Sequence, residues 1–146
     1  MVPTATLNGL SHLIIGCAIE VHRRLGPGLL ESIYVDALCI ELERAGLSYE
    51  RQKDVPIIYR DRKLGAPLKL DLIVAGKVII EVKSVSELAP VHEAQLLSYL
   101  RLTGIDLGLL INFNVAVLKS GVRRKMRQFV LPEKEELPKE NSEVAP

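Results

Sequence analysis

The sequence predicts an α/β fold, a sandwich of helices on a mixed sheet, built in the order two helices, three strands, one helix and one strand (ααβββαβ). Three observations predict it. Apolar residues recur at helical spacing through the first 45 residues, and the spacing then changes to two. A further helical segment follows, and after it comes a continuous apolar run of the kind that forms a strand buried on both faces.

The length and composition fit one domain with a sizeable core. The chain has 146 residues, and its hydrophobic share of 48% excludes disorder of the whole chain. We expect residues 1–131 to form one domain and residues 132–146, which hold five acids and two lysines, to form a disordered acidic tail. The net charge of the chain is +1, so the body without the tail has a charge near +4. That is a mild preference for polyanions.

Two helices are expected before residue 46. The first covers residues 6–25, where apolar positions recur at steps of three and four. The sequence Gly26-Pro27-Gly28 ends this helix. The second helix covers about residues 29–45, and Gly46 is a typical C-terminal stop.

An antiparallel meander of three strands follows, at residues 55–60, 64–74 and 78–85. Residues 61–63 form the turn between the first two strands. A short turn at residues 75–77 joins the second strand to the third, so these two form a β-hairpin.

The rest of the body holds one helix and the buried strand. The helix is expected at residues 89–102, because Pro90 suits a first helical turn and Gly104 follows the last. The buried strand covers residues 107–113. Residues 115–118 and 122–126 are expected to pair as a last hairpin at the edge.

Three charged residues interrupt the apolar strands of the hairpin at residues 75–77: Asp71, Glu81 and Lys83. A two-residue loop places Asp71 opposite Ile80, whereas a turn one residue longer places it opposite Glu81. In both registers the two carboxylates are cross-strand neighbours. Lys83 lies two residues beyond Glu81, so it points to the same face of the sheet.

The face with these charges also carries Ile73, Ile79 and Val85, so it is at least half buried. Two acids and a lysine in such a place are costly unless they have a partner. A surface salt bridge on a solvated sheet is the alternative, but the burial of paired acids favours a functional site. Such a cluster is the arrangement that holds a divalent cation and steadies a phosphate.

Glu31 lies in the first turn of the second helix. Steps of three and four place it on one stripe with Tyr34 and Leu38, so we expect this acid to face inward. One interpretation is that Glu31 stabilises the helix N-terminus through the helix dipole. The other is that it supplies a third carboxylate beside Asp71 and Glu81.

A polar row on the third helix consists of His92, Gln95 and Tyr99, again at steps of three and four. Each of them alone is typical of the boundary of a core. As a row beside an apolar stripe, they are placed to support the acidic site or to contact a phosphate.

The densest positive patch is the run of residues 123–127, which includes Arg123 and Arg124. Such a run is either a solvated edge or a surface that follows a nucleic-acid backbone. The chain has no Trp and only six Phe or Tyr residues, which does not favour an aromatic platform for base stacking.

Cys17 and Cys39 lie in apolar helical patterns, and we expect both to be buried thiols rather than a disulfide or a metal site. The first ten residues lack the features of a signal peptide, and no apolar stretch reaches membrane-spanning length. The sequence therefore predicts a cytoplasmic protein that does not bind membranes.

The charged hairpin resembles a known nuclease signature. Asp71 followed across a hairpin by Glu81-Val82-Lys83 resembles the PD-(D/E)xK signature, with Leu70 in place of the proline that precedes the aspartate. The strand signature alone is weak, because an acid followed two residues later by a lysine is common.

Two helical motifs strengthen the resemblance. Gln95 and Tyr99 are spaced as in the QxxxY motif of the RecB-type branch of these nucleases. Gly28, Glu31 and Tyr34 match the GxxExxY motif, which names a small bacterial and archaeal family placed in the same superfamily. All three motifs occur in the expected order, and the resemblance extends from the first helix to Arg127.

The resemblance implies a restriction-endonuclease-like α/β/α sandwich and a magnesium-dependent phosphodiesterase centre. Asp71, Glu81 and Glu31 would be catalytic and would ligate Mg²⁺ (or Mn²⁺). Lys83, also catalytic, would orient the attacking water or stabilise charge on the phosphorane. The other residues of the motifs and of the basic run would bind the substrate or support the site: Tyr34, His92, Gln95, Tyr99, Arg123 and Arg124.

We therefore expect a Mg²⁺-dependent nuclease that hydrolyses phosphodiester bonds in DNA. The alternative is a catalytically silent module on the same fold that binds nucleic acid or protein. Retention of Asp71, Glu81 and Lys83 together argues against that alternative. A third hypothesis is a regulatory partner that forms a stable homodimer.

Overall fold

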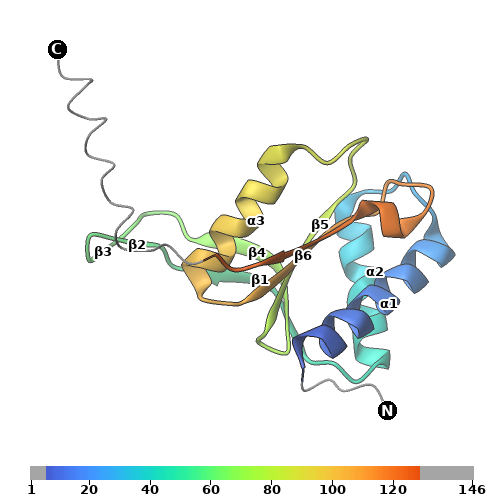
Figure 1. Cartoon of the computed structure of the whole chain (residues 1–146), viewed down its shortest axis with the longest axis horizontal. Coiled ribbons are helices and arrows are strands. Elements are labelled where there is room, and N and C mark those ends of the chain that lie inside the picture. Colours follow the sequence, from blue (N-terminus) through green and yellow to red (C-terminus); the bar gives the residue numbers. More distant parts are fainter. Residues whose placement is uncertain (1–5, 129–146) are drawn as a thin grey trace.

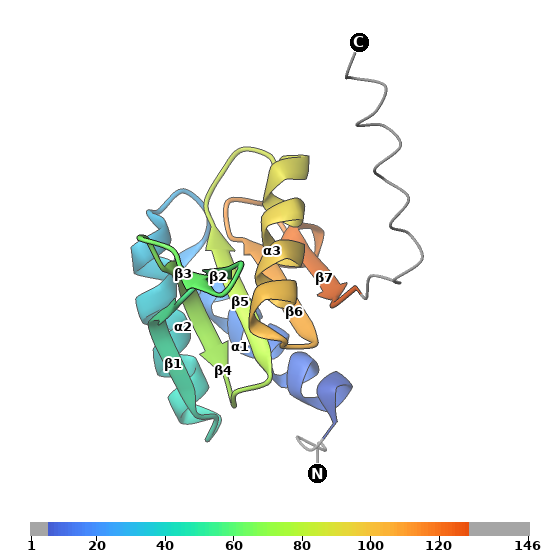
Figure 2. The same cartoon turned by 90° about the vertical axis from the view of Figure 1, so that its left-hand side faces the viewer.

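The computed structural model describes residues 6–128, which form a three-layer α/β fold. Two helices cover one face of a five-stranded mixed sheet, and one helix covers the other face (Figure 1 and Figure 2). The acidic tail predicted at residues 132–146 lies outside the described residues. Within residues 6–128, no helix has the length and apolar character that crossing a membrane would need.

The two N-terminal helices are α1 (Leu7–Leu25) and α2 (Glu31–Arg44). The Thr6 hydroxyl caps α1 by accepting a hydrogen bond from the Gly9 N–H at 2.9 Å. Gly26 ends α1 with a φ of +73°, a conformation that favours glycine. Both helices match the predicted segments, although α2 begins two residues later than expected.

The sheet has the strand order β1-β4-β5-β6-β7. Its strands are β1 (Tyr49–Val55), β4 (Leu68–Val74), β5 (Val78–Lys83), β6 (Leu107–Asn112) and β7 (Val122–Met126). β5 and β6 are parallel and are joined through α3 (Pro90–Thr103), whereas the other neighbouring strands are antiparallel. These findings confirm the predicted fold class, with its mixed sheet and its order of elements.

The sheet separates two apolar clusters. The larger one packs α1 and α2 against the sheet, and the smaller one packs α3 against the opposite face. Gly108 of β6 lets α3 approach closely, because a Cβ there would lie 2.7 Å from Leu96 Cδ1. Cys17 and Cys39 are buried free thiols, as predicted, and burial raises the pKa of each thiol.

The first strand of the meander lies elsewhere than predicted. The strand expected at residues 55–60 is only partly right: β1 ends at Val55, and Ile58–Tyr59 forms a separate strand, β2, outside the five-stranded sheet. Residues 49–55 are mostly exposed and lack an apolar alternation, so no periodic signal marks this edge strand. Its backbone pairing with β4 holds it in place instead.

The last predicted hairpin is right in its second strand, residues 122–126, and wrong in its first. Residues 115–118 form no strand; a short 3₁₀ helix, η1 (Leu118–Gly121), follows, and β7 pairs with β6. Leu118 is 3% exposed and anchors this segment in the larger cluster. A Cβ at Gly121 would lie 2.2 Å from the Asn112 carbonyl oxygen, so the absence of a side chain lets η1 pass this close to the end of β6.

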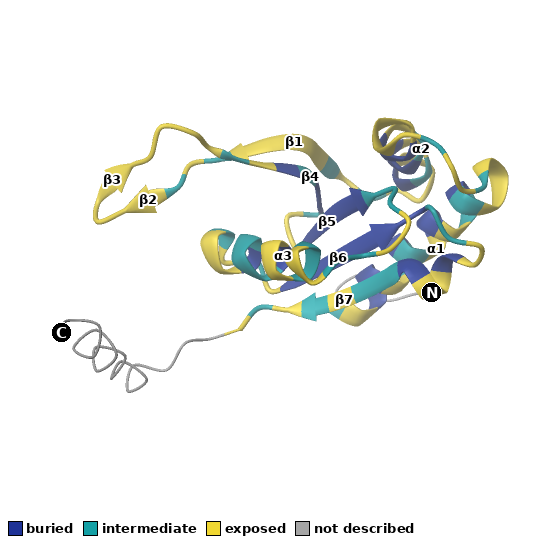
Figure 3. Cartoon of the chain, turned by 90° about the horizontal axis from the view of Figure 1, so that it is seen from above, coloured by how far each residue is buried: buried dark blue, intermediate teal, exposed yellow. Residues whose placement is uncertain are grey.

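A second hairpin, which we call the arm (residues 57–64), is inserted between β1 and β4. It consists of β2 (Ile58–Tyr59) and β3 (Arg62–Lys63) and projects beyond the sheet (Figure 3). Its turn is at Arg60-Asp61, so the turn predicted at residues 61–63 is displaced by one residue.

Candidate active site

The β4–β5 hairpin has the longer of the two predicted turns. Val74 pairs with Val78, so residues 75–77 form a three-residue turn, in which the Lys77 N–H donates to the Val74 carbonyl at 2.9 Å. Extending this register places Asp71 directly opposite Glu81. The structure therefore selects one of the two registers that the sequence left open.

The two carboxylates take the place of ladder bonds between β4 and β5. The Asp71 N–H donates to Glu81 Oε2 at 3.2 Å, and the Val82 N–H donates to Asp71 Oδ2 at 2.8 Å. The regular pairing of the strands ends at Leu72 and Ile80. Each carboxylate thus uses one oxygen to satisfy a backbone donor, and its second oxygen accepts no hydrogen bond from any described residue.

The neighbouring strand is irregular at the same level. Gln52 of β1 stands across from Asp71, between the paired residues Arg51 and Lys53, and has a φ of +53°. A positive φ in a non-glycine residue is uncommon within a strand. The sheet therefore departs from regular pairing on both sides of Asp71.

Burial controls the protonation of this pair. Glu81 is 8% exposed, and burial followed by repulsion from Asp71 raises the pKa of its carboxyl from 4.5 to about 8. Burial also raises the pKa of Asp71, against the opposing effects of the Val82 N–H and the Lys83 charge. A cation placed between the two acids would offset both shifts, because it favours the ionised forms.

Lys83 and Glu31 border the carboxylate pair from two different elements. Lys83 is the half-buried last residue of β5, and its charge lowers the pKa of both Asp71 and Glu81. Glu31 opens α2, and its charge is a smaller cause that raises the pKa of the same two groups. The predicted inward orientation of Glu31 is wrong, because its side chain is exposed at the helix end.

Ser84 ties Glu31 to the end of β5. The Ser84 N–H donates to Glu31 Oε2 at 3.3 Å, and the Ser84 hydroxyl donates to the Leu29 carbonyl at 2.6 Å. These two contacts hold the start of α2 beside Lys83. The sequence interpretation did not single out Ser84, and no periodic signal would have identified it.

Tyr34 organises the loop that precedes Glu31. It is fully buried, stacked on Phe113 with ring centroids 4.5 Å apart. Its hydroxyl donates to the Gly26 carbonyl at 2.5 Å and accepts from the Leu29 N–H at 3.1 Å. The tyrosine therefore supports the site by fixing the backbone, and its buried hydroxyl is committed to that loop.

The polar row on α3 divides into three roles. Tyr99 is near the acids, because their charges add to burial in raising the pKa of its hydroxyl. Gln95 is exposed on the same helix. His92 closes the start of α3, where its Nδ1 accepts from the Ala89 N–H at 3.0 Å.

The basic run does not form one patch. Arg123 and Lys125 point to the face of α3, where both form ion pairs with Glu93 at 3.5 Å and 2.7 Å. Arg124 points to the opposite face and donates to the Asn8 side chain at 2.6 Å. Side chains alternate between the two faces of a strand, so Arg123 and Arg124 do not belong to one basic patch, although they are adjacent in the sequence.

Asn112 is a supporting residue that the sequence interpretation missed. It is 2% exposed and lies beside Lys83 in the parallel register of β5 and β6. Its side chain accepts from the Val85 N–H and donates to the Val85 carbonyl, both at 3.0 Å. A polar residue inside the apolar run 107–113 was the signal that could have identified it.

The donor set fits a hard divalent cation. Among residues 6–128, no group of three or more His, Cys, Asp or Glu side chains is arranged to hold a metal ion. Asp71 and Glu81 form a pair, each with an uncommitted oxygen, and Glu31 likewise commits one oxygen to a backbone N–H, that of Ser84. Mg²⁺ is commonly held by one or two carboxylates together with water and substrate phosphate, so the pair alone suffices.

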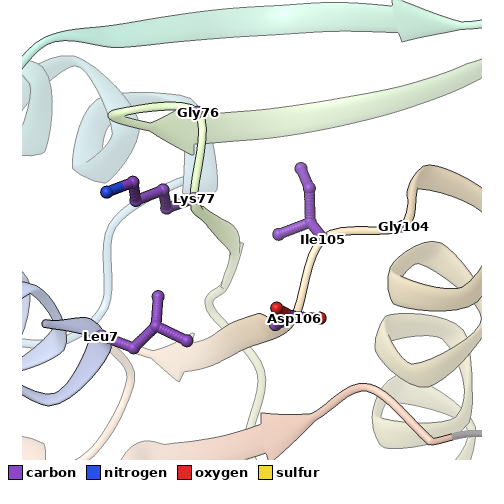
Figure 4. Close-up of a pocket in the computed structure, with 6 residues that line it drawn as sticks. All are labelled: Leu7, Gly76, Lys77, Gly104, Ile105 and Asp106. Atoms are coloured by element: carbon purple, nitrogen blue, oxygen red, sulfur yellow. The ribbon is translucent and has the colours of Figure 1, made fainter.

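The open pockets lie around the site rather than at its centre. A pocket at the β4–β5 turn, lined by Gly76, Lys77 and Asp106 among others, holds none of the candidate catalytic residues (Figure 4). Another pocket, at the start of α2, is lined by Leu29, Leu30, Glu31, Ser32 and Ser84. The chemistry of the paired acids, and not the size of a cavity, therefore locates the site.

Comparisons with known proteins agree with this geometry. A family model described as the PD-(D/E)XK nuclease superfamily matches residues 8–125. The chain is also similar to the crystal structure of SSO0001, with a TM-score of 0.46 and 19% identity, over 79% of this chain and 58% of that one. It thus spans little more than half of that protein, and so low a TM-score adds nothing to the assignment of the fold. A comparison with curated proteins finds no match.

Proposed function

The chain belongs to the PD-(D/E)XK nuclease superfamily, and from that premise we propose that it is a metal-dependent nuclease that hydrolyses phosphodiester bonds in DNA. Within the superfamily, its motifs support placement in the GxxExxY family and near the RecB-type branch. Its centre is the β4–β5 hairpin, with Asp71, Glu81 and Lys83 as catalytic residues and Glu31 as a further acid.

One observation carries this proposal: the interlocked pair of Asp71 and Glu81. Both carboxylates are held by backbone N–H groups at 2.8 Å and 3.2 Å, and Glu81 is 8% exposed. A buried acid and a half-buried acid that share a site are costly to ionise together. A divalent cation removes that cost, so the pair is built as a cation-binding site.

We assign each part of the proposed hydrolysis to residues of this chain. A bound Mg²⁺ or Mn²⁺ supplies Lewis-acid polarisation of the phosphate and a lower pKa for a bound water. Asp71 and Glu81 would hold the cation with carboxylates that backbone N–H groups fix in position. Lys83 places a positive charge beside the reacting phosphate, where it offsets the charge that develops during attack.

Other residues hold these groups in place. Tyr34 fixes the loop before α2, and Ser84 links Glu31 to the end of β5. Glu31 and Tyr99 border the acids, and the exposed Gln95 is available to the substrate. A rigid surround of this kind keeps the catalytic groups in register.

A cleavage assay with matched variants tests the proposal. The purified full chain with Mg²⁺ or Mn²⁺ should nick or degrade plasmid or single-stranded DNA. Glu81→Ala and Lys83→Ala should each reduce the rate by about 100-fold or more, because a fixed charge at the transition state is lost. Lys77→Ala, an exposed lysine in the turn of the same hairpin, should cleave at the parent's rate.

Equal cleavage by the Glu81 and Lys83 variants would assign the activity to a contaminant and reject the proposal. Calorimetric titration with Mn²⁺ gives a second readout. Absence of binding at millimolar Mn²⁺ would favour a silent binding module on the same fold. The homodimer and the cytoplasmic location stay predictions.

A further inference from the structure

The arm is the part of the chain that the catalytic proposal leaves unexplained. It is a two-stranded hairpin closed by the Leu64 N–H, which donates to the Ile57 carbonyl at 2.9 Å. It pairs with no other strand of the described structure. An isolated two-stranded hairpin contributes little to the stability of a fold, so a stabilising role does not explain it.

The arm leaves the sheet at the end where the candidate active site lies. The last pair between β1 and β4 is Val55 with Leu68. In the register of β4 and β5, Leu68 stands at the level of Ser84, one residue beyond Lys83. Figure 1 and Figure 3 both show the arm projecting on the same side of the sheet as α3, away from α1 and α2. The arm therefore leaves the sheet at the end to which Asp71, Glu81 and Lys83 belong, on the side that α3 covers.

The arm exposes apolar side chains that a free surface would not need. Ile58 is 58% exposed, Tyr59 is 61% exposed and Leu64 is 43% exposed. Single exposed apolar residues are normal, but three on one short hairpin indicate a surface that is covered in use.

The charges of the arm indicate what covers it. Arg60, Arg62 and Lys63 form no ion pair with any acid in the described part of the chain, and Asp61 is the arm's single acid. The Arg60 guanidinium lies 5.9 Å from the centre of the Tyr59 ring. An exposed aromatic ring on a hairpin with three unpaired cations fits a polyanion with planar groups, and the shared positive charge repels a second copy of the same arm.

The backbone conformation of the arm's turn also supports a binding role. Arg60 and Asp61 have φ values of +50° and +65°, the conformation in which hairpin turns strongly prefer Asn-Gly. A non-glycine residue held there costs free energy, and such strain concentrates where the side chain has a task. The turn keeps an arginine at its tip despite that cost.

We propose that the arm binds an unpaired stretch of the nucleic acid that the β4–β5 hairpin cleaves, with Tyr59 stacked on a base and with Arg60, Arg62 and Lys63 at the phosphates. This inference rests on the proposed nuclease function and names single-stranded nucleic acid as its substrate class. One tyrosine stacks on one base and is not a platform of several aromatics. A base offers its face to such a ring only where it is unpaired.

Equilibrium binding without cleavage tests the arm separately from the chemistry. The full chain carrying Glu81→Gln is titrated, without divalent cations, into a fluorescent single-stranded oligonucleotide and into its duplex. Adding Tyr59→Ala should weaken single-strand binding by about 5- to 100-fold, the value of one stacking contact. Tyr59→Phe keeps the ring and should bind within about twofold of the parent.

The turn provides a second matched pair. The double variant Arg60→Asn with Asp61→Gly creates the preferred turn sequence and removes the cation. Single-strand binding should therefore weaken. The plot of log binding constant against log salt concentration should become less steep by about 0.7. Asp61→Gly alone keeps Arg60 and should not weaken binding. A circular dichroism spectrum equal to the parent's excludes misfolding as the cause.

Each outcome separates this inference from the nuclease proposal. If the wild type cleaves DNA but the Tyr59→Ala and Tyr59→Phe variants bind the single strand with equal affinity, the proposed role of the arm is rejected. The nuclease proposal is then unaffected. Arm-dependent binding by a protein that cleaves nothing with any metal supports the arm and rejects the nuclease. An equal loss on the duplex, or a loss of self-association with unchanged binding, overturns the assignment of the arm to unpaired nucleic acid.

Discussion

The chain contains two charged β-hairpins that differ in their surroundings. The β4–β5 hairpin lies in the middle of the sheet, where Glu81 is 8% exposed and its carboxyl pKa is raised to about 8. The arm projects from the sheet, and its Tyr59 is 61% exposed. Charge within the buried hairpin is costly, whereas charge on the arm is not.

A lysine therefore has a different meaning in the two hairpins. Lys83 is half-buried beside two acids, so its presence needs a chemical reason. Lys63 is exposed, so its charge alone indicates nothing. On the arm the informative features are the exposed apolar side chains and the positive φ angles at the turn.

A matched pair of isoleucines gives the largest expected difference between the two hairpins. Ile80→Ala in β5 removes a side chain that is 0% exposed and should lower the free energy of unfolding by about 2–5 kcal/mol. Ile58→Ala on the arm removes one that is 58% exposed and should change it by less than about 0.5 kcal/mol. Urea denaturation of the full chain, followed by circular dichroism, measures both.

An equal loss for the two isoleucine variants would show that the arm is packed in solution, and the comparison would fail. An unchanged m-value in both titrations is the control, because it shows that the variants alter stability and not the extent of unfolding.

The pH dependence of stability should come from the buried hairpin. The pKa of Glu81 is raised from 4.5 to about 8 in the folded state, and that of Asp71 is also raised. Between pH 4.5 and 8 the unfolded chain therefore binds fewer protons than the native protein. Without divalent cations, the free energy of unfolding should fall by up to about 1.4 kcal/mol per pH unit as pH rises through that window.

Glu81→Gln is the control for this titration, since the amide keeps the acceptor for the Asp71 N–H and does not ionise. Its melting temperature should fall less than the wild type's between pH 5 and pH 8. Adding Mg²⁺ at pH 8 should raise the wild-type melting temperature. A wild type as insensitive to pH as the variant would contradict the burial of an ionisable Glu81.

The smallest expected effect concerns the turn of the arm. Asp61→Gly relieves a φ of +65° that costs a non-glycine residue free energy, so it should stabilise the arm. Greater chain entropy in the unfolded state offsets part of the gain, so the net change should be about 0–1 kcal/mol. Amide hydrogen exchange of Leu64, whose N–H closes the hairpin, measures it locally. Faster exchange in the variant would show that the turn is not strained.

Sequence reasoning predicted the helices, the mixed sheet and the neighbourhood of Asp71 and Glu81, because each has a local signal. It left two possible registers for the pairing of β4 with β5, and the structure has the one with the three-residue turn. It failed for β1, whose exposed polar residues show no alternation. It also assigned Arg123 and Arg124 to one basic patch, although successive residues of a strand face opposite sides of the sheet.

The sequence by itself determined those parts whose cause lies within a few residues of chain. These are the apolar spacing of α1, α2 and α3, the continuous apolar run of β6, and a short turn that brings Asp71 beside Glu81. Periodicity and turn length are local properties, so they can be read directly from the order of residues.

The tertiary structure alone decided what depends on contacts between distant segments. It placed β1 on β4 through backbone bonds, fixed the end of β5 through Asn112, and left Glu31 exposed and bonded to Ser84. It also removed Glu81 from water, which raises its pKa to about 8. Burial is the sum of many packed neighbours, and for that physical reason the raised pKa values of the two acids depend on the fold and not on the motif.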